Sequence, residues 1–385
     1  MNQSPSFLIV GTGQMGSALA YDLVRSEGVA HVTVADIDLK NAERVAARLP
    51  SNKVRPVGLD VNYFDDVIEL MRGHDCVIGA VSYRYNYALS KAAVEASTHF
   101  CDLGGNDEVV ERQLSLDELA RARGVTIVPN CGLAPGLANI LAAGGAAKFE
   151  TLHSMKMRAG GLPQHPRPPL NYQLVFSAEG LLNEYSGLSA VIRGGRVTKL
   201  PTLTEIESLG FPQPFGTLEA FHTSGGTSLL PRLYEGKVLE LDYKTIRYPG
   251  HCEKFKALLD IGFGDNDPMT IGSNVLTERE IFIELLKRKL PSSGPDVVLL
   301  RVTVDGLRSN REQRLTYNLI DFHSETDNIT AMMRTTSYPT SIIAQMLASG
   351  SITQRGVLTP EQCVPVDPLI SGLKERGVNI VETWE

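Results

Sequence analysis

A glycine-rich turn near the N-terminus is the first feature whose residue types and spacing suit a defined chemistry. It lies between the apolar run Phe7–Val10 and a helical pattern, and Asp36 ends a second apolar run twenty residues after the last glycine. In such a turn the first glycine allows a tight bend, the second lets the backbone approach a pyrophosphate, and the third allows close helix–strand packing. The turn consists of Gly11, Thr12, Gly13, Gln14, Met15 and Gly16. Strand, turn, helix, strand and acid together predict a dinucleotide-binding domain.

Asp36 predicts which dinucleotide binds. Its carboxylate can accept hydrogen bonds from the adenine-ribose hydroxyls, and it would repel the 2′-phosphate of NADP. Lys40 and Arg44 leave NADP open as the alternative, because their side chains could fold back toward a phosphate. We therefore predict NAD as the cofactor. Three further residues at predicted strand ends are expected to contact it: Asp60, Val81 and Ser82.

Polar residues at the ends of later strands are candidates for substrate chemistry. His222 and His251 each stand beside glycines, and either imidazole could accept a proton near neutral pH. Asp102, which follows another apolar run, is the third candidate acceptor. Arg247 ends a strand and suits bidentate binding of a carboxylate. The competing interpretation is structural, with histidines satisfied in the core and Arg247 paired with an acidic side chain.

The elements that position these residues follow two patterns. Over the first 130 residues, short apolar runs alternate with helical patterns, which is typical of a doubly wound parallel α/β sheet of the Rossmann type. Ser115 and Glu118 predict a capping box at one helix start. Six strands are predicted, at residues 7–10, 31–35, 54–59, 76–81, 99–103 and 125–128.

From residue 151 to about 322 the pattern indicates an α+β domain, expected to bind substrate and to support oligomerisation. Its segments look antiparallel; residues 297–304 and 315–322 predict a hairpin, and Thr277 with Glu280 predicts a capping box. The substrate is expected in a cleft between the two domains. The predicted domains are 1–134, 135–334 and a C-terminal segment, 335–385, that packs back on the first domain.

Composition excludes several classes of protein. The chain has 385 residues and a net charge of −7 without a basic stripe, which argues against nucleic acid as a partner. Its apolar runs are too short to span a membrane, and no basic region precedes Phe7 as in a signal peptide. The five cysteines form no CxxC pair, which indicates a reducing cytoplasm. We expect a cytoplasmic protein without a metal site.

Several segments, taken in order along essentially the whole chain, carry a resemblance. They are the glycine turn, Ala134-Pro135-Gly136, Pro168 through Tyr172 to Glu179-Gly180, Glu219 to Gly226, and Lys244 to His251. Together they resemble the saccharopine dehydrogenase-like family, most closely its L-lysine 6-dehydrogenase members. The resemblance implies NAD-dependent oxidative deamination of an amino acid's terminal amine, in a homo-oligomer. It also implies four substrate-binding residues: Tyr172, Thr223, Ser224 and Arg247.

Three positions depart from these relatives. Saccharopine-forming members typically carry an acidic residue where Ala134 stands and an arginine within the stretch matched by Thr223 and Ser224, and this chain has neither. The missing arginine removes a clamp for a second dicarboxylic portion, which favours a smaller substrate such as lysine. Lysine 6-dehydrogenases carry an aspartate where Asn130 stands, which keeps a different diamine or amino acid open.

Amine oxidation sets its own requirement, because hydride can leave a C–N carbon only when the nitrogen lone pair is free. A lysine amine has a pKa of about 10.4 in water, so the site must deprotonate it through burial and a nearby base. Hydrolysis of the resulting imine then releases ammonia. The leading hypothesis is an NAD(P)-dependent dehydrogenase acting on a CH–NH or CH–NH2 group, with lysine or a close analogue as its substrate.

Two other hypotheses stay open. One is a saccharopine-type reductase that forms a secondary amine from an amino acid and a carbonyl compound. The other is a non-catalytic NAD-binding protein, against which the polar cluster from His222 to Thr227 argues.

Overall fold

The computed structural model describes residues 4–49 and 51–385, which fold into two compact units. Unit 1 comprises the chain up to Gly144 together with Met333–Asn379, and unit 2 comprises Gly145–Met332 together with Ile380–Glu385. The predicted domain boundaries at 134/135 and 334/335 stay predictions. The end of the predicted C-terminal segment, 335–385, needs correction. Its last strand, β18 (Ile380–Trp384), pairs with β16 (Arg311–Phe322) in the sheet of unit 2 and not with the first domain.

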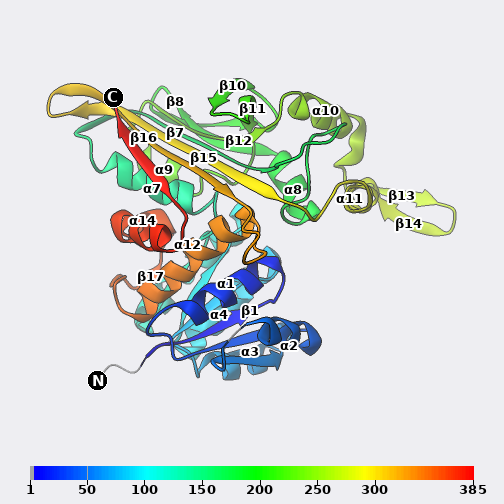
Figure 1. Cartoon of the computed structure of the whole chain (residues 1–385), viewed down its shortest axis with the longest axis vertical. Helices are drawn as coiled ribbons and strands as arrows, with labels where there is room; N and C mark the ends of the chain where they lie inside the picture. The colour runs from blue at the N-terminus through cyan, green and yellow to red at the C-terminus, as the bar shows by residue number, and fades with distance from the viewer. Residues whose placement is uncertain (1–3, 50) are drawn as a thin grey trace. The chain divides into compact units, whose positions relative to one another are not determined.

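Unit 1 contains a seven-stranded sheet in which neighbouring strands are parallel (Figure 1). The strand order is β17-β6-β5-β4-β1-β2-β3, so the direction of winding reverses between β1 and β4. This confirms the predicted doubly wound sheet, to which β17 adds a short strand that was not predicted. The strands are β1 (Ser6–Val10), β2 (His31–Asp36), β3 (Val54–Gly58), β4 (Cys76–Gly79), β5 (His99–Asp102), β6 (Thr126–Val128) and β17 (Gly356–Val357).

The helices of unit 1 connect these strands and bury their apolar side chains. Val67 of α3, Leu89 of α4 and Ala120 of α6 pack in one core with Leu8 and Phe100 of the sheet. The helical elements are α1 (Gln14–Arg25), α2 (Leu39–Arg48), α3 (Phe64–Met71), η1 (Tyr83–Tyr85), α4 (Asn86–Ala96), α5 (Asp107–Leu114), α6 (Asp117–Ala122), α7 (Leu137–Ala146), α12 (Ala331–Ala348), α13 (Pro360–Cys363) and α14 (Val366–Glu375). Helices α7 and α12 continue across the division between the units.

The predicted capping box at Ser115 is wrong. The Ser115 hydroxyl donates to the Arg112 carbonyl at 2.6 Å, and Leu116 precedes helix α6 without a side-chain cap. Ser115 has helical dihedral angles, so the chain turns from α5 into α6 without the extended residue that a capping box requires.

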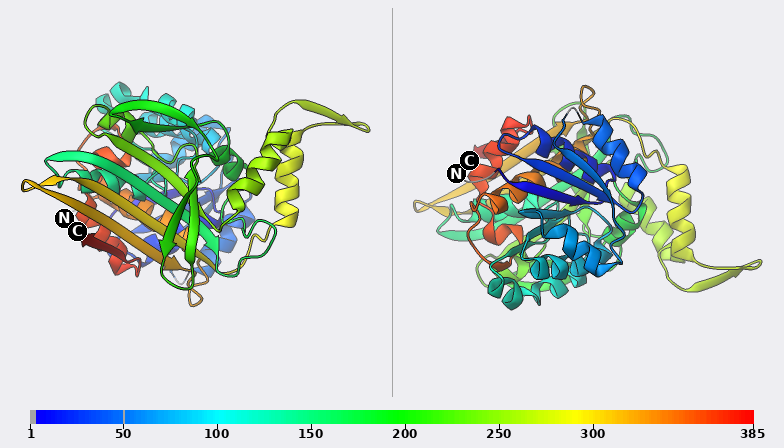
Figure 2. Two further views of the ribbon diagram at one scale, coloured as in Figure 1. Left: turned by 90° about the horizontal axis from the view of Figure 1, so that it is seen from above. Right: turned by 90° about the horizontal axis from the view of Figure 1, so that it is seen from below.

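Unit 2 is built on a nine-stranded mixed sheet (Figure 2). Its main order is β10-β11-β12-β7-β15-β16-β18, and β8 pairs with both β12 and β9. The predicted hairpin is confirmed by the antiparallel pair β15–β16, whereas β12 and β7 are parallel, so the antiparallel expectation is wrong there. A parallel pair needs a long crossover, and two helices (α8 and α9) and four strands lie between β7 and β12 in sequence. The remaining strands are β7 (Thr151–Pro163), β8 (Leu188–Arg193), β9 (Arg196–Pro201), β10 (Glu207–Phe211), β11 (Gly216–His222), β12 (Glu240–Arg247) and β15 (Asp296–Arg308).

A helical layer and a separate hairpin complete unit 2. The capping box is confirmed at α11: the Glu280 amide donates to the Thr277 hydroxyl at 3.1 Å, and the Thr277 amide donates back to the Glu280 carboxylate at 2.8 Å. The two-stranded hairpin β13–β14 stands away from the nine-stranded sheet (Figure 2). These elements are α8 (Ala178–Tyr185), α9 (Leu230–Tyr234), α10 (His251–Leu258), η2 (Leu259–Phe263), β13 (Pro268–Ile271), β14 (Asn274–Thr277) and α11 (Glu278–Lys289). None of the helices within residues 4–49 and 51–385 has the length and hydropathy needed to cross a membrane.

Candidate functional site

The glycine turn connects β1 to α1 at the carboxyl end of β1. Gly11 has a φ of 101°, its amide donates to the Ala35 carbonyl at 2.8 Å, and a Cβ there would lie 2.6 Å from the Ala80 carbonyl oxygen. A Cβ on Gly16 would lie 1.9 Å from the Gly11 oxygen, so only glycine lets α1 begin this close to the turn. Gly13 is exposed, and a Cβ there would meet nothing within 4 Å. This open backbone at a helix N-terminus fits the pyrophosphate of a dinucleotide.

Asp36 lies at the end of β2, beside the glycine turn. Its carboxylate accepts hydrogen bonds from the Thr12 amide at 2.9 Å, the Thr12 hydroxyl at 2.6 Å and the Asp38 amide at 3.1 Å. Burial raises the pKa of Asp36, but these donors outweigh burial and hold the pKa below its usual value. Lys40 and Arg44 are exposed on α2. Asp36 is therefore held as an anion, the form that ribose hydroxyls can bind.

The other predicted cofactor residues all belong to unit 1. Asp60 follows β3, and its carboxylate accepts from the Asn62 amide at 3.0 Å and side chain at 2.8 Å. The rest lie in the first turn of α1 or just after β4: Gln14, Met15, Val81 and Ser82. Their contacts with a cofactor stay predictions.

Asp102 is fully buried at the end of β5. Its carboxylate accepts from the Gly104 amide at 2.8 Å, the Asn130 amide at 3.3 Å and the Gln113 side chain at 2.7 Å. Burial raises its pKa to about 6, against the lowering effect of these donors. Asp102 thus links the ends of β5 and β6 through hydrogen bonds, and its role as a proton acceptor stays a prediction.

In unit 2, strand β12 divides the predicted site residues between the two faces of the sheet. His222 of β11 lies directly opposite Lys244 of β12, and directly opposed residues share a face. Arg247 is three residues beyond Lys244 on the same strand, so the alternation of side chains places it on the other face. Tyr243 shares the face of Arg247 for the same reason. The sheet therefore separates His222 from Arg247.

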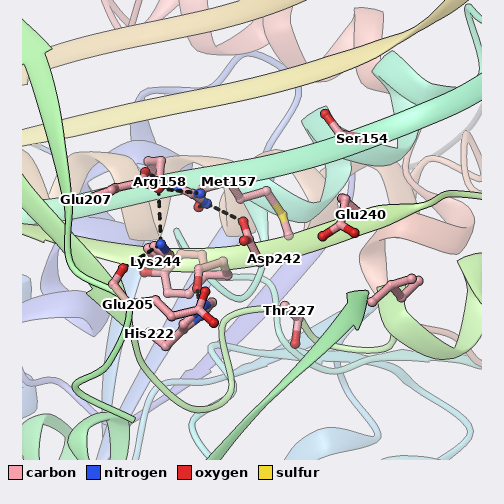
Figure 3. Close-up of polar contacts among 12 residues, drawn as sticks. Ser154, Met157, Arg158, Glu205, Glu207, His222, Thr227, Glu240, Asp242 and Lys244 are labelled. Atoms are coloured by element: carbon pink, nitrogen blue, oxygen red, sulfur yellow. Dashed lines mark hydrogen bonds and ion pairs between the residues drawn. The ribbon is translucent and has the colours of Figure 1, made fainter. Parts of the chain in front are cut away.

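The face that carries His222 holds a buried ion network (Figure 3). Arg158 of β7 donates to Asp242 at 2.6 Å and to Glu207, and Lys244 donates to Glu207 at 3.1 Å. Burial raises the pKa of Asp242, but the charge of Arg158 outweighs burial and holds that pKa below its usual value. Arg193 adds a second cation, 2.9 Å from Asp242. Because cations and carboxylates are matched here, this buried ion network is a structural feature of the sheet.

His222 borders the buried ion network. Its Nδ1 lies 3.2 Å from the Tyr243 carbonyl, and its Nε2 lies 3.0 Å from the Glu205 carboxylate. Burial lowers the pKa of His222, whereas Glu205 raises it. Since both neighbours are acceptors, neither ring nitrogen of His222 directs a lone pair toward a substrate in this arrangement.

The opposite face holds a second group, which we call the Arg247 cluster. Arg247 is 3 % exposed; its Nε donates to the Tyr185 hydroxyl and its Nη1 to the Ile246 carbonyl, both at 2.8 Å. Its guanidinium carbon lies 4.8 Å from the centre of the Tyr172 ring. These hydrogen-bonding and ring partners are neutral, and among the described residues no carboxylate forms an ion pair with Arg247, although the charge of Glu184 acts on it. The cluster comprises Tyr172, Glu184, Tyr185, Tyr243, Arg247 and His251.

His251 connects to Arg247 through Tyr185. Its Nδ1 lies 2.9 Å from the Leu170 carbonyl, which can only accept, so Nδ1 carries the proton. The other ring nitrogen, Nε2, then accepts from the Tyr185 hydroxyl at 3.0 Å, while that oxygen accepts from Arg247. Burial and the charge of Arg247 lower the pKa of His251 to about 3, so the ring is neutral near pH 7. In this arrangement His251 orients Tyr185 beneath Arg247.

Two polar groups of the Arg247 cluster lack hydrogen-bond partners among residues 4–49 and 51–385. Tyr172 is 3 % exposed, and its hydroxyl has no hydrogen-bond partner in the described chain. Burial raises its pKa to about 12. The half-buried Glu184 carboxylate likewise accepts no hydrogen bond from the residues described. Burial raises the pKa of Glu184 to about 7, against the lowering effect of Arg247.

Glu184 was missed by the sequence analysis, although a signal for it exists. Helix α8 buries Ala178, Leu181, Leu182 and Tyr185, which is one apolar face with helical spacing. Glu184 follows Leu181 by three positions and therefore lies at the edge of that face. Charged residues at the edge of a buried helix face are common, so this position is only a weak signal in the sequence.

Thr223 and Ser224 were predicted to bind substrate, but both side chains have partners within unit 2. The Thr223 hydroxyl lies 2.9 Å from that of Thr245. Ser224 donates its hydroxyl to the Asn183 carbonyl at 2.7 Å and its amide to the Glu184 carbonyl at 2.8 Å. Ser224 thus holds the end of α8, the helix that carries Glu184.

Comparison with known families assigns both parts of the chain. The family described as the saccharopine dehydrogenase C-terminal domain matches residues 132–378, and the one described as the saccharopine dehydrogenase NADP binding domain matches residues 7–128. The chain belongs to the saccharopine dehydrogenase family. This saccharopine dehydrogenase family member is an oxidoreductase with a nicotinamide-dinucleotide domain. The predicted enzyme class, an NAD(P)-dependent dehydrogenase acting on a CH–NH or CH–NH2 group, is confirmed at this level.

Individual relatives agree with the family assignment. A saccharopine dehydrogenase [NADP(+), L-glutamate-forming] of Pyricularia oryzae is 26% identical over 80% of this chain and 69% of its own length. A mitochondrial alpha-aminoadipic semialdehyde synthase of Rattus norvegicus is 21% identical over 98% of this chain, which spans about half of that protein (48%). The apo saccharopine dehydrogenase (L-Glu forming) of Saccharomyces cerevisiae shares the fold, with a TM-score of 0.81 and 20% identity over 99% of this chain and 100% of its own.

Proposed function

We propose that this family member oxidises the terminal amine of an amino acid with NAD, as L-lysine 6-dehydrogenases do. The observation that supports this most is the state of Arg247: a guanidinium 3 % exposed whose described partners are all neutral. The Glu184 charge acts on Arg247 without forming a hydrogen bond or an ion pair with it among the described residues, so the guanidinium is suited to direct pairing with an incoming anion. The planar guanidinium matches a substrate carboxylate.

The proposed chemistry uses the dinucleotide as hydride acceptor. A bound NAD would supply the acceptor for the hydride that leaves the amine-bearing carbon, and hydrolysis of the resulting imine by water would release ammonia. Before the hydride leaves, the amine must lose its proton, since its pKa in water is about 10.4. His222, His251 and Asp102 remain the predicted acceptors of this proton.

The choice of NAD over NADP is also a proposal. It is supported by the Asp36 carboxylate, which Thr12 holds as an anion at the end of β2. The names of the relatives point the other way, because the family domain and the fungal enzyme are both described with NADP. In the proposed complex the backbone from Gly11 to Gly16 holds the pyrophosphate.

A saccharopine-type reaction is the second candidate, because the Pyricularia relative is described as a saccharopine dehydrogenase. Saccharopine carries a second dicarboxylic portion, which needs a further cation. Thr223 and Ser224 stand where saccharopine-forming relatives carry an arginine. This difference favours the smaller substrate.

One assay separates the candidates. The protein is mixed with NAD or NADP and either L-lysine or saccharopine, and the absorbance of the reduced cofactor is followed. Our proposal requires L-lysine to be oxidised with release of ammonia and NAD to be preferred. Oxidation of saccharopine alone establishes the second candidate, and cofactor binding without turnover of any amine in a broad panel establishes a non-catalytic NAD-binding protein.

Two accompanying predictions stay proposals. We propose a homo-oligomer, as the resemblance to lysine 6-dehydrogenases implies, which sedimentation velocity tests directly. We also propose a cytoplasmic location, which is supported by five cysteines that are all free and buried.

A further inference from the structure

Glu184 occupies an unfavourable place for an unpaired carboxylate. It lies in the last turn of α8, where the negative end of the helix dipole disfavours an anion. Its side chain is half-buried and accepts no hydrogen bond from the described residues. A carboxylate kept in such a position is suited to a cation that arrives with a ligand.

The surroundings of Glu184 show which ligand atoms the position can reach. Glu184 directly precedes Tyr185 in α8, and the Tyr185 hydroxyl accepts from Arg247 at 2.8 Å. Against the lowering effect of burial, the negative charge of Glu184 raises the pKa of Arg247, as expected for a carboxylate near that guanidinium. The Tyr172 hydroxyl has no partner in the described chain, so it remains available to a ligand. Helix α8 and the segment before it therefore bring one carboxylate and one unused hydroxyl toward the face of the sheet that carries Arg247.

We propose that Glu184 binds the α-ammonium group of an amino-acid substrate while Arg247 binds its α-carboxylate. The two substrate groups are bonded to the same carbon, so one head group can meet two side chains that lie near each other. This inference rests on the proposed function, because it identifies the substrate class as an α-amino acid rather than a simple amine. The terminal amine to be oxidised lies at the other end of the substrate, away from Glu184.

The rest of the fold holds Glu184 in place. Ser224 donates its amide to the Glu184 carbonyl at 2.8 Å and its hydroxyl to the Asn183 carbonyl at 2.7 Å, which satisfies carbonyls at the end of α8. On the other side of the head group, Tyr185 fixes the Arg247 guanidinium through a hydrogen bond of 2.8 Å. Both side chains that would bind the head group, Glu184 and Arg247, are therefore held in place by neighbouring secondary structure.

The test uses two ligands that differ only in the α-ammonium group. L-norleucine carries the complete amino-acid head group and hexanoate carries the carboxylate alone, and neither has a terminal amine to react. Their binding to the full chain saturated with NAD is measured by isothermal titration calorimetry near pH 8. The variants are Glu184→Gln and the matched control Glu253→Gln, which changes an exposed carboxylate on α10.

In wild type, L-norleucine should bind more tightly than hexanoate. Glu184→Gln should weaken the binding of L-norleucine by about 30-fold or more, the usual effect of removing one member of a desolvated charge pair. Hexanoate should bind the variant as well as, or better than, it binds wild type, because an anion beside its carboxylate has been removed. Glu253→Gln should change neither ligand. The proposal is overturned if Glu184→Gln weakens the binding of both ligands equally or leaves L-norleucine binding unchanged. If Glu184→Gln fails to fold, the proposal is overturned when Glu184→Asp also loses the preference for L-norleucine over hexanoate.

Turnover of L-lysine separates this inference from the proposed function. If wild type oxidises L-lysine but Glu184→Gln keeps the preference for L-norleucine, the function stands and the head-group site is refuted. If the preference disappears in Glu184→Gln while no terminal amine is oxidised by wild type, the head-group site stands and the proposed reaction is wrong.

Discussion

The substitution Arg247→Met tests the proposed carboxylate site most directly. Methionine keeps an unbranched side chain of similar length but removes the charge and all donors. Arg247 donates to Tyr185 and Ile246 and forms no ion pair in the described chain, so its guanidinium can still bind a substrate carboxylate directly. The variant should therefore lose activity toward amines that carry a carboxylate.

The size of the loss follows from burial. Arg247 is 3 % exposed, and removing one partner of a desolvated, hydrogen-bonded charge pair costs about 2–5 kcal/mol. This corresponds to a fall in kcat/KM of about 30-fold or more. Stability should change less, because two hydrogen bonds of about 1 kcal/mol each are lost while an unpaired buried cation is also removed.

The assay compares L-lysine with pentane-1,5-diamine, which has the same terminal amine but no carboxylate. Steady-state kinetics and urea unfolding are measured for wild type, Arg247→Met and Arg158→Met. Arg158 lies in the buried ion network on the opposite face, where Arg193 and Lys244 would still partner its carboxylates. Arg158→Met should lower stability by about 3 kcal/mol and leave the preference for L-lysine unchanged. Equal losses on both amines in Arg247→Met, or its failure to fold, would assign Arg247 to the scaffold.

Three further predictions concern unit 1 and the two histidines. Asp36→Ala should weaken the binding of NAD and reduce the ratio of NAD affinity to NADP affinity, measured by fluorescence titration. A wild-type preference for NADP contradicts our interpretation of this acid. His251→Gln should lower kcat/KM for L-lysine by about tenfold with NAD affinity kept, because Tyr185 is loosened beneath Arg247, whereas His222→Gln on the other face should have a smaller effect; equal effects refute the assignment of faces. Burial raises the pKa of Asp102 from 3.8 to about 6, so the folded state binds its proton more tightly, and the contribution of Asp102 to stability falls by about 3 kcal/mol as the pH rises from about 4 to 6. Urea unfolding across this range should show no such fall in Asp102→Asn, and an unchanged fall there would show that another group is responsible.

The dinucleotide site could be predicted from sequence because it is local. Gly11, Gly13, Gly16 and Asp36 lie within 26 consecutive residues, and their spacing alone implies one strand, one helix and a second strand. The hydrogen bonds from Thr12 to Asp36 follow from this local geometry. The capping box at Thr277 was predictable for the same reason.

The substrate side depends on contacts between distant segments, which spacing does not reveal. Arg247 and His222 were both predicted as site residues because each ends a strand. Only the pairing of β11 with β12 shows that their side chains lie on opposite faces of the sheet. Register is set by the whole sheet, including the parallel pairing of β12 with β7. Glu184 belongs to no recognisable sequence motif. It becomes a candidate only through its position relative to Arg247, which lies 63 positions later in the chain.

The alternation along β12 also guides the engineering of substrate range. Positions 243, 245 and 247 share the face of the Arg247 cluster, whereas Asp242 and Lys244 belong to the buried ion network. A combinatorial library that randomises only the three odd positions varies the chemistry offered to a ligand and leaves the ion pairs intact. All three positions are buried, so such a library samples packing as well as ligand chemistry, and its folded members must be selected first. Adjacent residues of this strand thus act on two different sets of neighbours, one that offers groups to a ligand and one that holds the sheet together.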